Sequence, residues 1–406
     1  MGDAAQDKKP TVGNGRPVLF VAPQPFFIPT GTPINVLGMC RALCEEGYQV
    51  HLLTLPLGSH IELENLVYHR VSAIPFVRRV PVGFSVAKGM YDLLLAVGLV
   101  AMLFRQRFLA VHALEESAFF AVPIARWFRT PAIVDLDSDL SQQLREQPSR
   151  LGRWLAKPAE VLRRHALRGA HWAVTVAPYL TALVRRESPG TKVTEIPDTP
   201  LDAALRQPDR AEQEKLRQEL KLPTEAPVLV YTGNFGHRQG LPLLIEAMPK
   251  IRAHYPSCRL LLVGGEPPEI EDLRRLAEKH AVAEAVVFAG RRPPENMPEV
   301  MALASVLVSP RVEPNVTPLK IYSYMASGRP IVATDLPTHN TVVDGDCAVL
   351  VPPSAEGLAR GISSILREPE LGERLGARAR ERVHDLYSFA TFKQRMLELY
   401  ASLDGG

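Results

Sequence analysis

The chain has 406 residues, more than the roughly 100–200 of one ordinary domain, so two domains are expected. Hydrophobic residues make up 46% and charged residues 22%, which excludes a disordered, collagen-like or polytopic membrane chain. A net charge of +3 lacks the strong positive field typical of nucleic-acid-binding proteins, so no nucleic-acid partner is expected.

Predicted strands alternate with helical stretches along almost the whole chain. In the first half, strands are predicted at Pro17–Ala22, Gln49–Leu55, Leu66–Val71, Leu109–Leu114, Ala132–Asp137, Trp172–Val176 and Lys192–Pro197. In the second half, they are predicted at Val228–Gly233, Arg259–Gly264, Ala285–Ala289, Val306–Ser309, Ile331–Thr334 and Ala348–Val351. Several of these runs are apolar throughout, which is typical of parallel strands buried on both faces.

This alternation predicts an α/β fold of two doubly wound, Rossmann-like domains in series, with a ligand cleft between them. A highly charged stretch with prolines at both ends follows Asp198 and separates the halves. We therefore expect an N-terminal domain over residues 17–200 and a C-terminal domain over 201–385. Residues 386–406 are predicted to form a closing helix.

Two features bear on the location of the chain. Residues 1–16 are polar and have no apolar h-region, which predicts a disordered tail and argues against a secretory signal. Four cysteines without a CxxC pair form neither a disulfide framework nor a zinc ribbon, and they indicate a reducing compartment. A cytoplasmic location is therefore expected.

The first half also carries a candidate membrane surface. The apolar run Leu93–Phe104 is shorter than the about 20 residues that span a bilayer, so it predicts a buried or interfacial helix. A second helical stretch, residues 141–170, is rich in basic side chains that include Arg163 and Arg164. Such helices either contact anionic lipid or simply form a solvated surface.

Two loops that follow predicted strands are candidates for anion binding. The first loop, residues 29–33, contains Gly31 and then Thr32, which can cap the helix that follows. The capped helix end either binds an anion or is a plain helix cap. In the second, residues 231–240, three glycines allow close approach of a ligand and Arg238 can meet a phosphate. Because the second loop is neither GxGxxG nor a Walker motif, phosphate binding and a structural turn both stay open.

The densest loop is residues 309–330. Thr317 as cap and Pro318 as first residue predict a helix whose first turn contains Lys320. A cation is unfavourable at the positive end of a helix dipole unless an anion lies there too. The sequence therefore predicts a phosphate or diphosphate held by Lys320 and the helix amides, with Arg311 and Glu313 nearby. A lysine that extends to solvent is the alternative.

The residues of these loops resemble a known family. The run PLKIYSYMASGRPIVATD resembles the donor-site helix of the retaining glycosyltransferases of the GT-B fold, glycosyltransferase family four, also called glycosyl transferases group 1. The run YTGNFGHRQGLPLLIEA resembles the strand, phosphate loop and helix of that family. Two further runs, LLLVGGEPPEIEDLRRLAEKH and VVFAGRRPPENMPEVMALASVLVSPR, match the next units in order.

The resemblance implies an enzyme of EC class 2.4 that transfers a sugar from a nucleotide sugar to an acceptor hydroxyl with retention. It implies no metal and no other cofactor, because basic side chains and backbone amides neutralise the diphosphate. The basic, apolar-flanked helices of the first half predict a peripheral enzyme at the inner face of the membrane that acts on a lipid-linked or cell-envelope glycan, or else a soluble enzyme. The closing helix is expected to cross back to the N-terminal domain.

The resemblance also implies roles for individual residues. The implied catalytic residues are His112, Glu115, Glu116, Arg238 and Lys320. The implied donor-binding residues are Gly31, Thr32, Gly233, Asn234, Phe235, Gln239, Gly240, Gly264, Gly265, Arg291, Arg311, Glu313, Asn315, Thr317, Pro318, Leu319 and Ser323.

The chain departs from the family pattern at several of these positions. Ser323 and Asn315 stand where the family commonly has glutamates, so Glu313 is expected to replace the earlier one. Asn234 and Gln239 stand where the phosphate loop usually has Arg and Lys. These changes keep two alternatives open, namely a catalytically silent GT-B scaffold protein and a sugar-nucleotide epimerase.

The N-terminal half departs from the pattern as well. The family often has a His-x-His pair after the fourth strand, and His112 retains only the first of these histidines. Glu115 or Glu116 is expected to face the sugar in place of the second.

Overall fold

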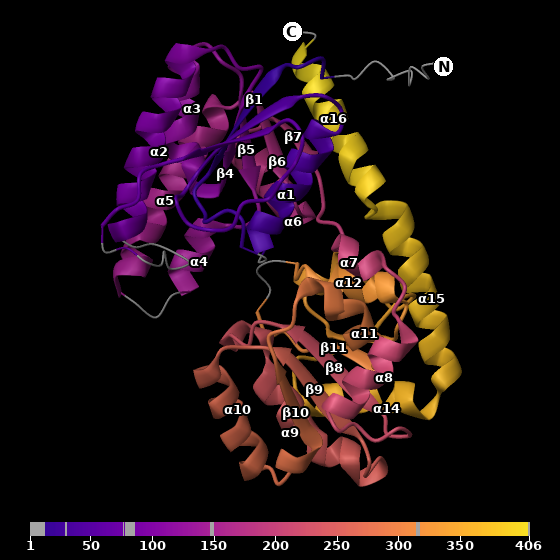
Figure 1. Ribbon diagram of the computed structural model, residues 1–406. Coiled ribbons are helices and arrows are strands. Elements are labelled where there is room, and N and C mark those ends of the chain that lie inside the picture. Colours follow the sequence, from indigo (N-terminus) through magenta and orange to yellow (C-terminus); the bar gives the residue numbers. More distant parts are fainter. Residues whose placement is uncertain are drawn as a thin grey trace, which may run out of the picture. The chain divides into compact units, whose positions relative to one another are not determined.

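The computed structural model describes residues 13–28, 31–75, 77, 86–146, 150–313 and 317–404. The chain divides into two compact units (Figure 1). Unit 1 comprises the residues up to Pro197 together with those from Phe389 onward, and unit 2 comprises Asp198–Ser388. Each unit is an α/β fold around one parallel sheet, which confirms the predicted fold class.

The sheet of unit 1 has seven strands in the order β3-β2-β1-β4-β5-β6-β7, and every neighbouring pair is parallel. The strands are β1 (Pro17–Ala22), β2 (Gln49–Thr54), β3 (Leu66–Arg70), β4 (Val111–Leu114), β5 (Ala132–Leu136), β6 (Trp172–Thr175) and β7 (Lys192–Glu195). Their ends agree with the predicted ones to within two residues. Residues 13–16, predicted as part of a disordered tail, are instead held against unit 1, because Gly13 and Gly15 donate backbone hydrogen bonds to Glu46 and Gly47.

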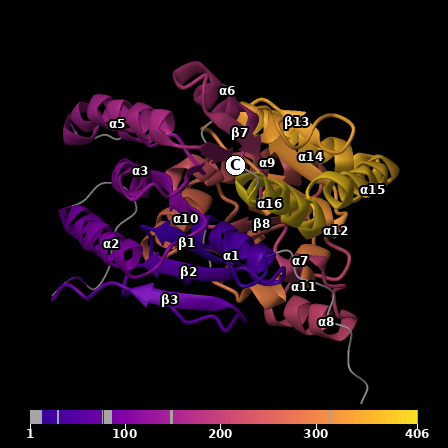
Figure 2. The same ribbon diagram turned by 90° about the horizontal axis from the view of Figure 1, so that it is seen from above.

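Helices cover both faces of this sheet (Figure 2). One face is covered by α2 (Val86–Arg105), α3 (Ala118–Trp127), α5 (Arg150–Gly169) and α6 (Pro178–Glu187). The other face is covered by α1 (Gly31–Cys44) and α16 (Phe389–Asp404). The closing helix α16 is fixed to α1, since the Arg41 guanidinium lies over the Phe389 ring at 4.4 Å.

Helix α2 has two different faces. Tyr91, Leu95 and Leu99 are fully buried against the sheet, which fixes the helix to unit 1. The opposite side exposes Leu93 and Val97, at the spacing of one helix face. Among the described helices, α2 contains one segment, Ala87–Arg105, that is apolar and long enough to span a membrane by length and composition.

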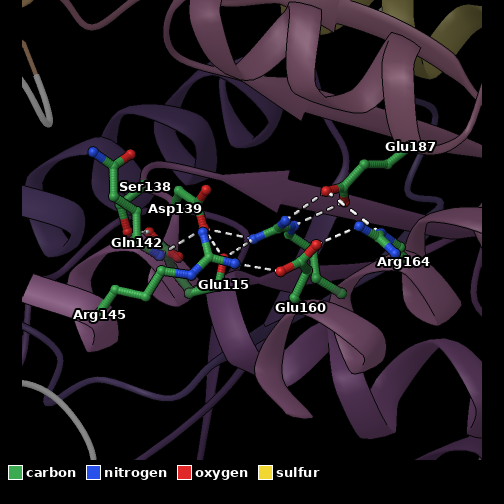
Figure 3. Close-up of polar contacts among 10 residues, drawn as sticks. Glu115, Ser138, Asp139, Gln142, Arg145, Glu160, Arg164 and Glu187 are labelled. Carbon is green, nitrogen blue, oxygen red and sulfur yellow. Dashed lines mark hydrogen bonds and ion pairs between the residues drawn. The ribbon is translucent and has the colours of Figure 1, made fainter. Parts of the chain in front are cut away.

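The basic stretch in residues 141–170 is partly an internal ion-pair network. Arg163 on α5 is buried and binds Asp139 and Glu187, while Arg164 and Arg145 both pair with Glu160 (Figure 3). Arg145 belongs to α4 (Leu140–Glu146), and Glu187 ends α6. Neither alternative, lipid contact or a solvated surface, holds for Arg163, because its guanidinium is enclosed by carboxylates inside unit 1.

The sheet of unit 2 has six parallel strands in the order β10-β9-β8-β11-β12-β13. They are β8 (Val228–Gly233), β9 (Arg259–Gly264), β10 (Val286–Gly290), β11 (Val306–Ser309), β12 (Ile331–Thr334) and β13 (Val349–Val351). The helices are α7 (Asp202–Leu205), α8 (Arg210–Glu219), α9 (Leu241–His254), α10 (Pro267–Lys279), α11 (Met297–Ala302), α12 (Lys320–Ser327), α13 (Pro337–Asn340), α14 (Ala355–Arg367) and α15 (Pro369–Leu386).

Both sheets have a switch point where the strand order reverses. It lies between β1 and β4 in unit 1 and between β8 and β11 in unit 2. At such a point the loops after the two strands diverge to opposite faces and leave room for a ligand at the carboxyl ends of the strands. The candidate loops after β8 and β11 therefore meet at the switch point of unit 2.

Candidate functional site

In unit 2, glycines bring the loops at the switch point into backbone contact. Gly264 ends β9, and a Cβ atom there would lie 1.9 Å from the carbonyl oxygen of Gly233 at the end of β8. Gly240 has φ 69°, and a Cβ atom there would lie 1.9 Å from the carbonyl oxygen of Pro310. The Val312 amide donates to the Arg238 carbonyl oxygen at 3.1 Å, which joins the loops after β8 and β11.

Lys320 lies at the centre of this arrangement. Its ammonium donates to the Tyr231 hydroxyl at 2.5 Å and to Gln239 Oε1 at 3.0 Å. Nζ also lies 3.7 Å from the centroid of the Tyr231 ring, which is a cation–π contact. Burial, and then the positive charge of Arg311, hold the pKa of Lys320 well below its usual value. Within the described part of unit 2, no carboxylate pairs with Lys320, so the site has an unmatched positive charge.

The helix that carries Lys320 begins later than predicted. Helix α12 starts at Lys320, with Leu319 as its N-cap residue and no side-chain cap. The prediction that Thr317 is the cap is wrong, because its hydroxyl bonds to the Thr341 hydroxyl at 3.2 Å. The Pro318 carbonyl accepts from the Ile321 amide in a turn that precedes the helix. Lys320 is still in the first turn, and the uncapped amides there suit an anion.

Helix α12 is also fixed to strand β8. The Thr232 amide donates to the Tyr324 hydroxyl at 2.8 Å, and burial raises the pKa of Tyr324 to about 12, so the hydroxyl stays neutral. Ser323, the predicted ribose contact, is buried on the same helix. Asn315, the other predicted contact at this loop, lies outside the described residues.

Arg238 and Glu313 form an ion pair of 2.8 Å between Arg238 Nε and Glu313 Oε2. His237 Nδ1 lies 4.0 Å from the other oxygen of Glu313. The structure thus brings these predicted residues together, but the charge of Arg238 is already balanced by a carboxylate. Lys320 is therefore the cation at the switch point on which the donor assignment depends, and the charge of Arg311 reaches it.

Two of the implied donor-binding residues, Gly264 and Gly265, lie at the end of β9, and a third, Arg291, follows β10. Gly265 packs against the ring of Phe235, where a Cβ atom would approach within 2.3 Å of the ring. Arg291 pairs with Glu266, the residue that caps α10. The Asn234 carbonyl accepts from the Tyr231 hydroxyl at 2.6 Å, which fixes the phosphate-loop backbone beneath Lys320.

His339 is a residue of this site that sequence reasoning missed. It lies on α13, is fully buried, and donates from Nδ1 to the Thr334 carbonyl at 2.7 Å. Its Nε2 accepts from the Ser309 hydroxyl at 2.8 Å, and the Thr334 hydroxyl donates to the Arg311 carbonyl at 2.7 Å. The sequence does indicate that His339 follows the strand that became β12, and this places it at the same edge of the sheet as Ser309.

We expect the stability of unit 2 to fall below pH 6.5 through His339. Burial lowers the pKa of His339 to about 4 from an ordinary value of 6.5, so the unfolded chain binds the proton more tightly. Stability is complete above pH 6.5 and declines as the pH falls toward 4, with a loss of about 2 kcal/mol at pH 5. Urea unfolding at pH 7.5 and pH 5 tests this, and His339→Gln should lose this part of the pH dependence. An unchanged pH dependence in that variant would contradict the assignment.

In unit 1, polar groups gather at the corresponding edge of the sheet. Glu115 follows β4 with a left-handed φ of 51°, and its Oε1 accepts from the Ser138 hydroxyl at 3.0 Å. Asp137 follows β5 and accepts from the Asn35 amide of α1 at 3.1 Å. Burial, and then the charges of Asp137 and Glu116, raise the pKa of Glu115 well above its usual value.

Glu116 is bound differently from Glu115. It forms an ion pair with Lys88 on α2, and its charge together with burial raises the pKa of Asp92 to about 7. Of the two predicted glutamates, Glu115 is therefore the one without a cationic partner among the described residues.

The start of α1 differs from the expected anion site. The helix already begins at Gly31, so the prediction that Thr32 is its cap is wrong. Residues 29–30 of that loop lie outside the described residues. The side chain of α1 that reaches the polar group after β5 is Asn35.

His112, one of the implied catalytic residues, lies in the core of unit 1. Its ring is fully buried and stacks on Phe20 with centroids 4.5 Å apart. Nε2 donates to Asp135 Oδ2 at 3.2 Å, and Nδ1 accepts from the Tyr400 hydroxyl of α16 at 2.9 Å. The alternation of side chains along β4 places His112 on the face covered by α1 and α16, so both ring nitrogens are used inside the core.

Comparison with known proteins adds to this geometry. Residues 212–382 match the family described as "Glycosyl transferases group 1", and residues 30–199 match the "Glycosyl transferase 4-like domain". The sucrose-phosphate synthase of Thermosynechococcus elongatus has a similar structure, with a TM-score of 0.79, 23% identity, and coverage of 96% of this chain and 99% of that one.

Two curated relatives come from Mycolicibacterium smegmatis. A phosphatidyl-myo-inositol mannosyltransferase is 25% identical over 401 residues, which are 95% of this chain and 93% of the relative. A GDP-mannose-dependent alpha-(1-6)-phosphatidylinositol monomannoside mannosyltransferase is 30% identical over 200 residues, 47% of this chain and 52% of the relative. The chain therefore belongs to the GT-B glycosyltransferases of family four and is a nucleotide-sugar-dependent transferase of EC class 2.4.

Proposed function

We propose that the chain transfers a sugar, with retention of anomeric configuration, from a nucleotide sugar to a membrane glycolipid of the cell envelope. The observation that carries the donor assignment is the unmatched cation of Lys320 at the switch point of unit 2. A diphosphate there would meet the Lys320 ammonium, the uncapped amides of α12 and the charge of Arg311. It would also restore the pKa of Lys320, because an anion favours the protonated form.

Each residue then has a role in the transfer. Lys320 and the α12 amides stabilise the negative charge that develops on the departing diphosphate, which is an electrostatic role. Arg238 and Glu313 border the donor site, and Gly264, Gly265 and Arg291 border the nucleoside region. In unit 1, Glu115 accepts a hydrogen bond from a hydroxyl of the acceptor.

The relatives suggest which donor and acceptor to test first. One relative is named for GDP-mannose, and two are named for phosphatidylinositol lipids. We infer that GDP-mannose is the first donor to test and a phosphatidylinositol-type lipid the first acceptor. Incubation of the purified protein with both, followed by NMR of the fresh product, should show an α-linked sugar, the configuration of the donor. A β-linked product would contradict retention, and the absence of product with every nucleotide sugar would contradict transfer.

We also propose that unit 1 contacts the membrane from the cytoplasmic side through exposed apolar residues of neighbouring helices. Phe104 on α2 is 74% exposed, Trp127 on α3 is 81% exposed and Trp154 on α5 is 72% exposed. The α5 residues Arg153 and Lys157 are exposed beside Trp154. Apolar side chains interleaved with basic ones match the surface of an anionic bilayer.

The double substitution Phe104→Ser and Trp154→Ser should release the protein from anionic liposomes. We expect the partition coefficient measured by co-sedimentation to fall by about 30-fold or more, since the two aromatic side chains together contribute roughly 2–4 kcal/mol of partitioning. Leu386→Ser, which removes an exposed apolar side chain of α15 in unit 2, is the matched control. Equal sedimentation of the double variant and the wild type would contradict a membrane role for these helices.

A further inference from the structure

The cation of the donor site comes from helix α12, while the loop after β8 contributes the groups that hold it. Gln239 in that loop is neutral, and its Oε1 accepts from Lys320 at 3.0 Å. Tyr231 at the end of β8 accepts from the same ammonium at 2.5 Å and presents its ring to it at 3.7 Å. The Tyr231 hydroxyl in turn bonds to the Asn234 carbonyl and to Gln239 Oε1.

Lys320 contributes the ammonium of this cluster, and Arg311 is a second cation whose charge reaches it. Arg238, the basic side chain next to Gln239, pairs with Glu313 at 2.8 Å. A Cβ atom at Gly233 would lie 3.0 Å from Lys320 Nζ, so the ammonium covers the bare backbone at the end of β8. Two neutral oxygens and an aromatic ring therefore hold Lys320 without cancelling its charge.

We infer that Tyr231 and Gln239 are positioning residues that hold the Lys320 ammonium over the loop after β8, where it serves as the phosphate-loop cation of this enzyme. A neutral partner is required at position 239, because a carboxylate would neutralise Lys320 and a second cation would repel it. This inference rests on the proposed donor site and adds the reason why the loop itself lacks a lysine.

The key variant is Gln239→Glu, which places a carboxylate at hydrogen-bond distance from the Lys320 ammonium. If Gln239 had a merely structural role, the new ion pair would leave donor binding unchanged. For Gln239→Glu we expect stability and donor binding to change separately. The melting temperature should equal or exceed that of the wild type, while the Kd for the nucleotide sugar should be at least about tenfold higher. Tyr255→Phe, a half-buried tyrosine of the same unit, is the control.

A charge exchange between the two positions provides the second arm. Gln239→Lys alone brings two ammonium groups together, and Lys320→Gln alone removes the cation, so each should weaken donor binding by about tenfold or more. The double variant keeps one cation and one amide in contact, and it should recover at least half of the loss on a logarithmic scale. Calorimetric titration with the nucleotide sugar measures all four proteins.

The outcomes separate this inference from the proposed function. Wild-type affinity in Gln239→Glu, or no recovery in the double variant, would overturn the positioning role while the donor site stands. If the wild type binds no nucleotide sugar at all, the proposed function fails and the inference fails with it.

Discussion

Replacement of Lys320 by methionine should lower the rate of sugar transfer by about 10²–10³-fold while the chain stays folded. In the proposed donor site the ammonium meets the developing charge of the diphosphate, and the amides of α12 cannot replace a full charge. Because burial and Arg311 disfavour the protonated form of Lys320, methionine should leave the melting temperature unchanged or raise it. Steady-state transfer assays and thermal unfolding measure the two effects.

Lys279→Met provides the matched control, since Lys279 is an exposed lysine at the end of α10 in the same unit. Its rate should equal that of the wild type. Transfer by Lys320→Met at the wild-type rate would show that the diphosphate is bound elsewhere. A collapse of the melting temperature in that variant would instead show that Lys320 stabilises the fold.

Replacement of Arg163 by methionine should destabilise unit 1 by about 3–5 kcal/mol. Arg163 Nη1 binds Asp139 at 2.5 Å, and its Nη2 and Nε bind Glu187 at 2.7 Å and 3.1 Å. Arg163 also donates to the Ser141 hydroxyl at 2.6 Å. Removal of the guanidinium leaves two enclosed carboxylates without their cation, and that is costly because a buried charge loses its hydration.

Urea unfolding monitored by circular dichroism tests this expectation. Arg164→Met is the control, since Arg164 is a more exposed neighbour and exposed ion pairs contribute about 0–1 kcal/mol. Equal stability of the two variants would contradict the view that Arg163 joins α4, α5 and α6. It would also restore Arg163 as a candidate for lipid contact.

The arrangement of strands could be predicted from the sequence because each strand is a short apolar run bounded by loop residues. Each predicted strand is present, and the loops after Gly233 and Ser309 do meet at a switch point. The place of Lys320 in the first turn of a helix could also be predicted from the local pattern. The anion site that follows from the conflict between this cation and the helix dipole stays a prediction. These features depend on residues close together in the chain.

The features that could not be predicted depend on distant partners. His112 is a core residue because Tyr400, 288 positions later, returns on α16 and bonds to it. His339 belongs to the site because Ser309, 30 positions earlier, lies at the same sheet edge. Thr317 has the sequence pattern of a helix cap, but its hydroxyl bonds to Thr341, and the helix begins later. Hydrophobic periodicity and helix-capping rules use only residues close together in the chain, so they cannot predict contacts between such distant residues.

The most direct test of the account is whether a nucleotide sugar binds at Lys320. Thermal shift and hydrolysis should be measured with UDP-, GDP-, ADP- and TDP-sugars in the presence of EDTA, on the wild type and on Lys320→Met. The account predicts that one nucleotide sugar stabilises the wild type and is slowly cleaved, and that Lys320→Met loses both responses. No response to any nucleotide sugar, or an equal response from both proteins, would contradict it.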